Sequence, residues 1–113
     1  MMETTRQQKI ARLIQKDLGV IFQQETRNLF GGVMITVTKV HVAKDLSVAK
    51  SYVSIFPSKD KDTIMENIRK HTKEIRRMLG QKEHNQLRII PDLMFFLDDS
   101  LDYIDNIDKL LKS

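Results

Sequence analysis

Apolar residues recur every three or four positions near the start of the chain, and this spacing predicts an amphipathic helix over residues 3–27. Thr4 or Thr5 is placed to cap its start. Gly19 costs about 1 kcal/mol relative to Ala inside a helix, so we expect another part of the chain to pack closely against it. The stripe that would face a core consists of Ile10, Leu13, Ile14, Leu18, Ile21 and Phe22.

Two later segments alternate apolar with polar residues, as β-strands do when one face is buried. These segments, residues 33–42 and 48–56, are joined by the turn residues Lys44 and Asp45, which predicts an antiparallel hairpin. The alternation changes phase near Thr38, and such a change indicates a β-bulge.

A second helical stripe over residues 60–80 is followed by a third β-rich segment over residues 87–97. Gly80 is a plausible end for the helix, although the helix could resume through Lys82 and Glu83. The polar pair His71 and Thr72 interrupts its apolar stripe, which predicts a bend or a functional site there. The β-rich segment is apolar on both faces, as expected of a central strand, but Pro91 cannot donate to a ladder and so indicates an edge or a bulge.

Asp98, Asp99 and Ser100 are capping residues, and the apolar spacing after them predicts a short acidic helix. The predicted order is helix, strand, strand, split helix, strand, helix. The fold class is therefore α+β, with one three-stranded sheet and a C-terminal helix. The length suits a single domain over residues 1–113.

Charge is distributed unevenly along the chain. The net charge is +4, but residues 92–113 carry −4 and the rest carries +8. A basic body with an acidic end suits a polyanionic partner on one side, although a solvated surface explains the charge equally well. The basic residues that form clusters are Arg6, Lys9, Arg12 and Lys16 in the first helix and Lys70, Lys73, Arg76, Arg77, Lys82 and Arg88 in and after the second.

Patterns of catalytic residues are missing from the sequence. The chain has no Cys, and His41, His71 and His84 do not stand at metal-ligand spacing. No Gly-rich phosphate loop follows a strand, and no Ser lies in a nucleophile elbow. We expect neither an enzyme nor a bound metal or cofactor. Without a signal core or a membrane-length apolar run, we also expect a cytoplasmic protein.

The predicted order is that of the type-II KH fold, a module that clamps single-stranded RNA with a Gly-x-x-Gly loop. This chain contains no Gly-x-x-Gly. A KH-like frame without that loop must use helix faces and basic side chains. Such surfaces suit the phosphates of structured RNA better than base-by-base reading.

More specifically, the chain resembles the bacterial ribosome-binding factor A family from Arg6 to Leu111. The resemblance lies in an ordered set of motifs, none diagnostic alone. These are Arg6-x-x-Lys9-Ile10, Val33-x-Ile35-x-x-x-x-Val40, Asp45-Leu46-x-x-Ala49-x-x-Tyr52-Val53-Ser54, Ile75-Arg76-x-x-Leu79-Gly80, Leu87-Arg88-x-x-Pro91-x-Leu93-x-Phe95, Asp98-x-Ser100 and Ile107-Asp108-x-Leu110-Leu111.

The resemblance implies a monomeric, non-catalytic protein that binds the small (30S) ribosomal subunit. It further implies assistance in late 16S rRNA processing and a role in cold adaptation. In this family an interhelical Ala-x-Gly kink replaces the KH loop, and the corresponding residues here are His71, Thr72 and Lys73. We expect the two basic clusters to contact rRNA, while a solvated role explains each residue singly just as well.

One alternative comes from a different functional class. The acidic final helix and the hairpin would also suit a protein–protein adaptor. Binding to a protein partner would then survive RNase and depend on Asp102 and Asp105 more than on Arg76 and Arg77.

Overall fold

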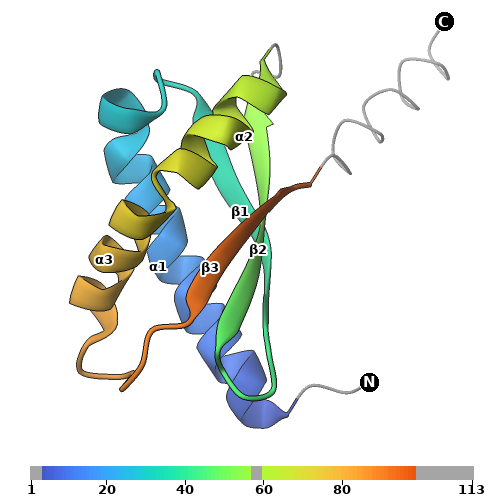
Figure 1. Cartoon of the computed structure of the whole chain (residues 1–113), viewed down its shortest axis with the longest axis vertical. Helices are drawn as coiled ribbons and strands as arrows, with labels where there is room; N and C mark the ends of the chain where they lie inside the picture. The colour runs from blue at the N-terminus through green and yellow to red at the C-terminus, as the bar shows by residue number, and fades with distance from the viewer. Residues whose placement is uncertain (1–3, 57–59, 99–113) are drawn as a thin grey trace, which may run out of the picture.

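A computed structural model describes residues 4–56 and 60–98 of the chain. Figure 1 shows the helices gathered to one side of a small twisted sheet. The elements are α1 (Thr5–Leu29), β1 (Met34–Val42), β2 (Val48–Phe56), α2 (Lys61–Lys70), α3 (Thr72–Glu83) and β3 (Asp92–Leu97). The predicted α+β class and the order α-β-β-α-α-β are confirmed. The predicted C-terminal helix lies outside the described residues.

Helix α1 begins and ends through local hydrogen bonds. Thr4 and Gln7 form a capping box, in which Gln7 N donates to Thr4 Oγ1 at 3.1 Å and Thr4 N donates to Gln7 Oε1 at 2.9 Å. At the other end, Gly31 and Gly32 have φ angles of +65° and +83°. Gly32 N donates to Thr26 O at 2.8 Å. These left-handed glycines end the helix and turn the chain into β1.

The sheet has the strand order β1-β2-β3. Strands β1 and β2 are antiparallel, and their register shifts between Val37 and Lys39, which confirms the bulge predicted near Thr38. Strand β3 pairs with β2 in parallel. The expectation of a central third strand is therefore wrong, because β2 takes the centre. Strand β3 is an edge, which is one of the two positions that Pro91 indicated.

Strand β3 is also shorter than its apolar pattern predicts. It begins at Asp92, and the preceding residues Leu87 and Ile90 pack against the core from a loop. Pro91 is buried and has no N–H with which to join a ladder. The apolar pattern of this loop therefore resembles that of a strand because its residues are partly buried, although they form no ladder with β2.

The two helical glycines behave differently from their sequence predictions. A Cβ on Gly19 would meet no atom within 4 Å, so the expected close packing against this residue is absent from the described structure. Gly80 does not end its helix; α3 continues to Glu83, which is the alternative that the sequence left open. A Cβ on Gly80 would lie 3.5 Å from Ile90 Cγ1, an ordinary contact.

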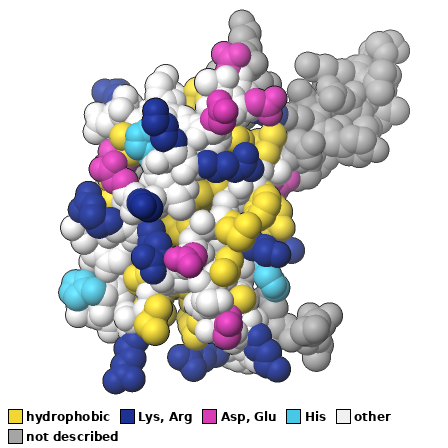
Figure 2. Space-filling model, in the orientation of Figure 1, with side chains coloured by type: hydrophobic (Ala, Val, Ile, Leu, Met, Phe, Trp, Pro, Cys, Tyr) yellow, Lys and Arg dark blue, Asp and Glu magenta, His cyan; other side chains and the backbone are white. Residues whose placement is uncertain are grey.

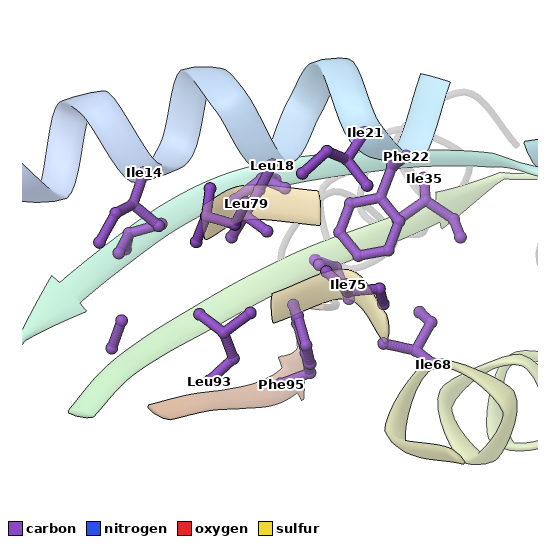
Figure 3. Close-up of a cluster of buried hydrophobic side chains, with 14 of the residues drawn as sticks. Ile14, Leu18, Ile21, Phe22, Ile35, Ile68, Ile75, Leu79, Leu93 and Phe95 are labelled. Carbon is purple, nitrogen blue, oxygen red and sulfur yellow. The ribbon is translucent and has the colours of Figure 1, made fainter. Parts of the chain in front are cut away.

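The core lies between the helices and one face of the sheet. Figure 3 shows the stripe of α1 facing side chains from α2, α3 and β3. Phe22 packs edge-on against Phe95, with ring centroids 5.7 Å apart and an interplanar angle of 79°. Ile75 and Leu79 of α3 have no exposed surface. Burial alternates along β1, β2 and β3, so the described helices α1, α2 and α3 cover one and the same face of the sheet.

Candidate functional site

A groove of about 800 Å³ lies where the start of α1, the β1–β2 turn and the α3–β3 loop meet. It brings together basic residues that are far apart in the sequence: Arg6 and Lys9 from α1 and Arg88 from the loop. All three side chains are exposed. The remaining lining residues are Thr5, Ile10, Asp45, Leu46, Ser47, Gln86, Leu87 and Ile89.

The first turn of α1 fixes the positions of Arg6 and Lys9. The capping box fixes the first turn, and Gln7 Nε2 donates to Val42 O at 3.0 Å, which ties this turn to the end of β1. Gln7 is buried, whereas the flanking basic residues are exposed. One buried amide thus anchors the helix start and leaves both cations facing solvent.

The β1–β2 turn and the α3–β3 loop are held to one another beside the groove. Asp92 N donates to Ser47 O at 2.9 Å. Within the turn, Ser47 donates to Asp45 Oδ1 from its backbone N at 3.1 Å and from its Oγ at 2.7 Å. These bonds lower the pKa of the Asp45 carboxyl. Leu46 takes a left-handed conformation with φ of +63° and packs against the core.

The other predicted basic residues are distributed over α1, α2 and α3. Arg12 is exposed, and Lys16 lines a hollow of about 590 Å³ between α1 and β1. Lys70 lines a different hollow on α2, while Lys73 and Lys82 are exposed. The groove therefore contains three of the ten predicted residues, and the described cavities place Lys16 and Lys70 elsewhere.

Arg76 is bound to the protein itself. Its Nη2 donates to Ile90 O at 2.6 Å, its Nε donates to Pro91 O at 3.2 Å, and Nε lies 3.6 Å from the Asp92 carboxylate. Arg69 of α2 donates to Phe95 O at 3.1 Å in a similar way. These two arginines donate to carbonyls at and just before the edge strand β3, where the described residues include no further strand to donate N–H groups. Arg77 differs, because it is exposed and only pairs with Glu74 at 3.7 Å.

Helices α2 and α3 are separated by a single residue, His71, whose φ is −99°. Its backbone N donates to both Asn67 O and Ile68 O at 3.1 Å, and its ring lies edge-on to Phe30. Thr72 Oγ1 donates to Ile68 O at 3.2 Å. The negative φ is open to any residue, so this interruption does not require Gly. Of the residues His71, Thr72 and Lys73 predicted to form a kink, His71 is the one outside both helices.

Sequence reasoning missed Glu83, a carboxyl with no exposed surface that faces α1 from the end of α3. Burial raises the pKa of Glu83 to about 8, and its approach to the Asp17 side chain adds to the increase. Neither carboxyl oxygen completes a hydrogen bond of normal geometry within the described residues. Its position four residues beyond Leu79 on the apolar stripe was the available signal.

Within residues 4–56 and 60–98, no group of three or more His, Asp or Glu side chains is arranged to hold a metal ion. The described helices include none that is long and apolar enough to cross a membrane.

Comparison with known proteins decides the family. A family model described as ribosome-binding factor A matches residues 6–111. The chain is 50% identical over 110 residues to the ribosome-binding factor A of Cytophaga hutchinsonii, covering 97% of this chain and 83% of that protein. This chain belongs to the ribosome-binding factor A family.

The solved structures agree with that assignment at the level of the fold. The crystal structure of ribosome-binding factor A from Thermus thermophilus is similar, with a TM-score of 0.67 and 19% identity over 80% of this chain and 94% of that one. A homology model of the Thermus thermophilus ribosome-binding factor A, fitted into the cryo-EM map of a 30S complex, gives a TM-score of 0.62 and 22% identity, covering 79% of this chain and 91% of that one. The family resemblance inferred from ordered motifs is thus confirmed.

Proposed function

We propose that this chain binds the small ribosomal subunit and assists late processing of 16S rRNA, acting in the cytoplasm as a single, non-catalytic RNA-binding domain over residues 1–113. The family assignment supports the first part, since the Thermus thermophilus relative is described in a 30S complex. The observation that carries the proposal is the groove that joins Arg6, Lys9 and Arg88.

The physical mechanism is phosphate neutralisation. Each Lys or Arg that reaches an rRNA phosphate releases condensed counterions, and this release favours binding. Three cations in one groove, two from α1 and one from the α3–β3 loop, can contact phosphates that are close in space but distant in sequence. Structured RNA presents such phosphates. Asp45 occupies the turn side of the groove, so we place the phosphates on the side of α1 and Arg88.

Co-sedimentation with small subunits tests the groove directly. We expect the charge-reversal pair Lys9→Glu with Arg88→Glu to lower the bound fraction strongly at low salt. Arg27→Glu reverses one charge, half the change made by the pair, near the far end of α1, about 30 Å away at 1.5 Å per residue, and should bind nearly as wild type does. Equal loss in both variants would show a diffuse charge effect, and no loss in the groove pair would refute the assigned surface.

The maturation role needs a second readout. In a strain that lacks the chromosomal gene, the wild-type protein should restore the mature 5′ end of 16S rRNA during growth in the cold. The groove pair should leave more precursor than Arg27→Glu does, as measured by primer extension. The adaptor alternative depends on Asp102 and Asp105, which lie outside the described residues; subunit association that survives digestion of exposed rRNA by RNase would favour it.

A further inference from the structure

The face of the sheet opposite the helices carries aromatic and basic side chains in register. Lys39 of β1 is paired with Tyr52 of β2, and Tyr52 with Phe96 of β3. The rings of Tyr52 and Phe96 lie side by side, with centroids 5.4 Å apart and planes inclined by 30°. The first row across this open face is therefore one cation followed by two adjacent rings.

The next row adds a second lysine and an exposed thioether. Lys50 of β2 is paired with His41 of β1 and with Met94 of β3. Lys50 is exposed, and Met94 is 45% exposed. Two lysines thus flank a platform formed by Tyr52, Phe96 and Met94. Figure 2 shows hydrophobic side chains gathered on the sheet side of the molecule, with basic side chains beside them.

The acidic groups at the two ends of β3 already have partners. Asp92 lies 3.6 Å from Arg76 Nε, and Asp98 Oδ2 accepts a hydrogen bond from Thr38 Oγ1 at 2.5 Å. Neither carboxylate belongs to the row formed by Lys39, Tyr52 and Phe96. The charge within the platform itself is therefore positive.

This composition fits a nucleic acid better than a dry protein interface. Lysine is depleted from the cores of protein–protein interfaces, and here it is in register with the rings. Proteins that bind unpaired RNA combine cations that follow the backbone with aromatic rings on which bases stack, and a β-sheet face is one scaffold for such rings.

We propose that this open sheet face is a second RNA contact, on which unpaired bases stack on Tyr52 and Phe96 while Lys39 and Lys50 contact the backbone phosphates. The inference rests on the proposed function in taking rRNA as the partner. It differs in mode, since the groove binds phosphates of structured RNA and the sheet holds a single strand.

Tyrosine fluorescence reports on the platform. The chain has two Tyr and no Trp, so Tyr103→Phe in the full-length protein leaves Tyr52 as the sole tyrosine emitter. Titration with a single-stranded oligoadenylate decamer should quench this emission to saturation. A base-paired duplex of the same length should quench it far less, because its bases are already stacked. No quenching by the single strand would overturn the proposal.

Two sets of variants identify the contacts. Tyr52→Leu with Phe96→Leu retains apolar side chains and should weaken decamer binding, measured by anisotropy, by about tenfold or more. Lys39→Gln with Lys50→Gln changes only exposed side chains, so it tests the face even if the ring pair perturbs folding. It should weaken binding several-fold, whereas Lys44→Gln in the turn should not. Wild-type affinity in the lysine pair would refute the phosphate contacts.

The two proposals fail separately. If the ring and lysine variants bind the decamer normally while Lys9→Glu with Arg88→Glu loses the small subunit, stacking is refuted and the groove stands. If the groove variants co-sediment normally while Tyr52 is quenched, the groove is refuted and stacking stands. If a purified protein partner rather than RNA quenches the emission of Tyr52, the proposal that RNA binds this sheet face is overturned.

Discussion

Arg76 Nη2 donates to Ile90 O at 2.6 Å, and this bond joins α3 to the segment that leads into the edge strand β3. The same guanidinium reaches Pro91 O and the Asp92 carboxylate. Three neighbouring acceptors therefore depend on one side chain. A residue that sequence reasoning assigned to RNA contact is also part of the fold.

We expect Arg76→Glu to destabilise the protein by about 1–3 kcal/mol, the range for leaving a hydrogen-bond acceptor without its donor. The new carboxylate would leave two carbonyls without their donor and would face Asp92. Arg77→Glu loses only an exposed pair with Glu74 and should stay within about 0.5 kcal/mol of wild type. Urea denaturation followed by circular dichroism measures both.

Arg76→Lys is the informative control. It retains the charge but cannot make the forked contacts of a guanidinium, so we expect an intermediate stability. Equal stability of Arg76→Glu and Arg77→Glu would contradict the structural role. Because the two arginines act differently, a binding experiment that reverses both charges together would mix folding with RNA contact.

Glu83 should make stability depend on pH. Its pKa is raised from 4.5 to about 8, chiefly by burial. Between these values the folded state keeps a proton that the unfolded state has lost, so the free energy of unfolding falls as pH rises and levels off above about 8. At about 1.4 kcal/mol per pKa unit, the total is a few kcal/mol.

Glu83→Gln isolates this contribution, because Gln resembles the protonated carboxyl at every pH. The variant should match wild type near pH 4.5 and exceed its stability by a growing margin up to about pH 8, as measured by urea denaturation across that range. Asp17→Asn should reduce the pH dependence without abolishing it, since burial is the larger cause. A difference between wild type and Glu83→Gln that does not change with pH would contradict the prediction.

Gly19→Ala should stabilise the protein by about 0.5–1 kcal/mol, because Ala is the better helix former and the added Cβ meets nothing within 4 Å. Thermal denaturation measures the gain. Gly32→Ala is the matched control: its φ of +83° strains any residue with a Cβ, so the same substitution should lower the melting temperature. A loss of stability in Gly19→Ala would show that a close contact forms at this position in solution.

Features that depend on neighbouring residues could be predicted from the sequence, and those that depend on distant contacts could not. The stripe of α1 and the bulge near Thr38 follow from periodicity, which reports burial directly. The edge position of β3 and the task of Arg76 depend on how α2 and α3 cross the sheet. Pro91 indicated an edge only as one of two options, and the contacts of Arg76 were missed. The length of β3 was overestimated because a partly buried loop and a paired strand show the same apolar residues.

The candidate site divides in the same way. The basic residues were visible in the sequence, but only the turn, the loop and the capped start of α1 bring Arg6, Lys9 and Arg88 into one groove. The residues of the open sheet face could also be identified from the sequence, because they alternate with the buried ones. That Lys39, Tyr52 and Phe96 form one row could not be predicted, because it depends on the register of β2 with β1 and with β3.

Salt should weaken binding to the small subunit steeply. If about six phosphates are neutralised, log K should fall with log salt with a slope of about −4 to −5, at about 0.7–0.9 per phosphate. Lys9→Gln with Arg88→Gln removes two cations of the groove and should make the slope shallower by about 1.5. Affinity measured by filter binding at four or more salt concentrations gives both slopes.

Arg27→Gln removes one exposed cation from the last turn of α1 and is the control for net charge. Its slope should equal that of wild type, because a cation that contacts no phosphate releases no counterions on binding. A groove variant that binds more weakly at every salt concentration with an unchanged slope would mean that Lys9 and Arg88 support binding without touching phosphates. That result would move the phosphate contacts to the exposed lysines of α2 and α3, Lys70, Lys73 and Lys82, which are the next residues to change.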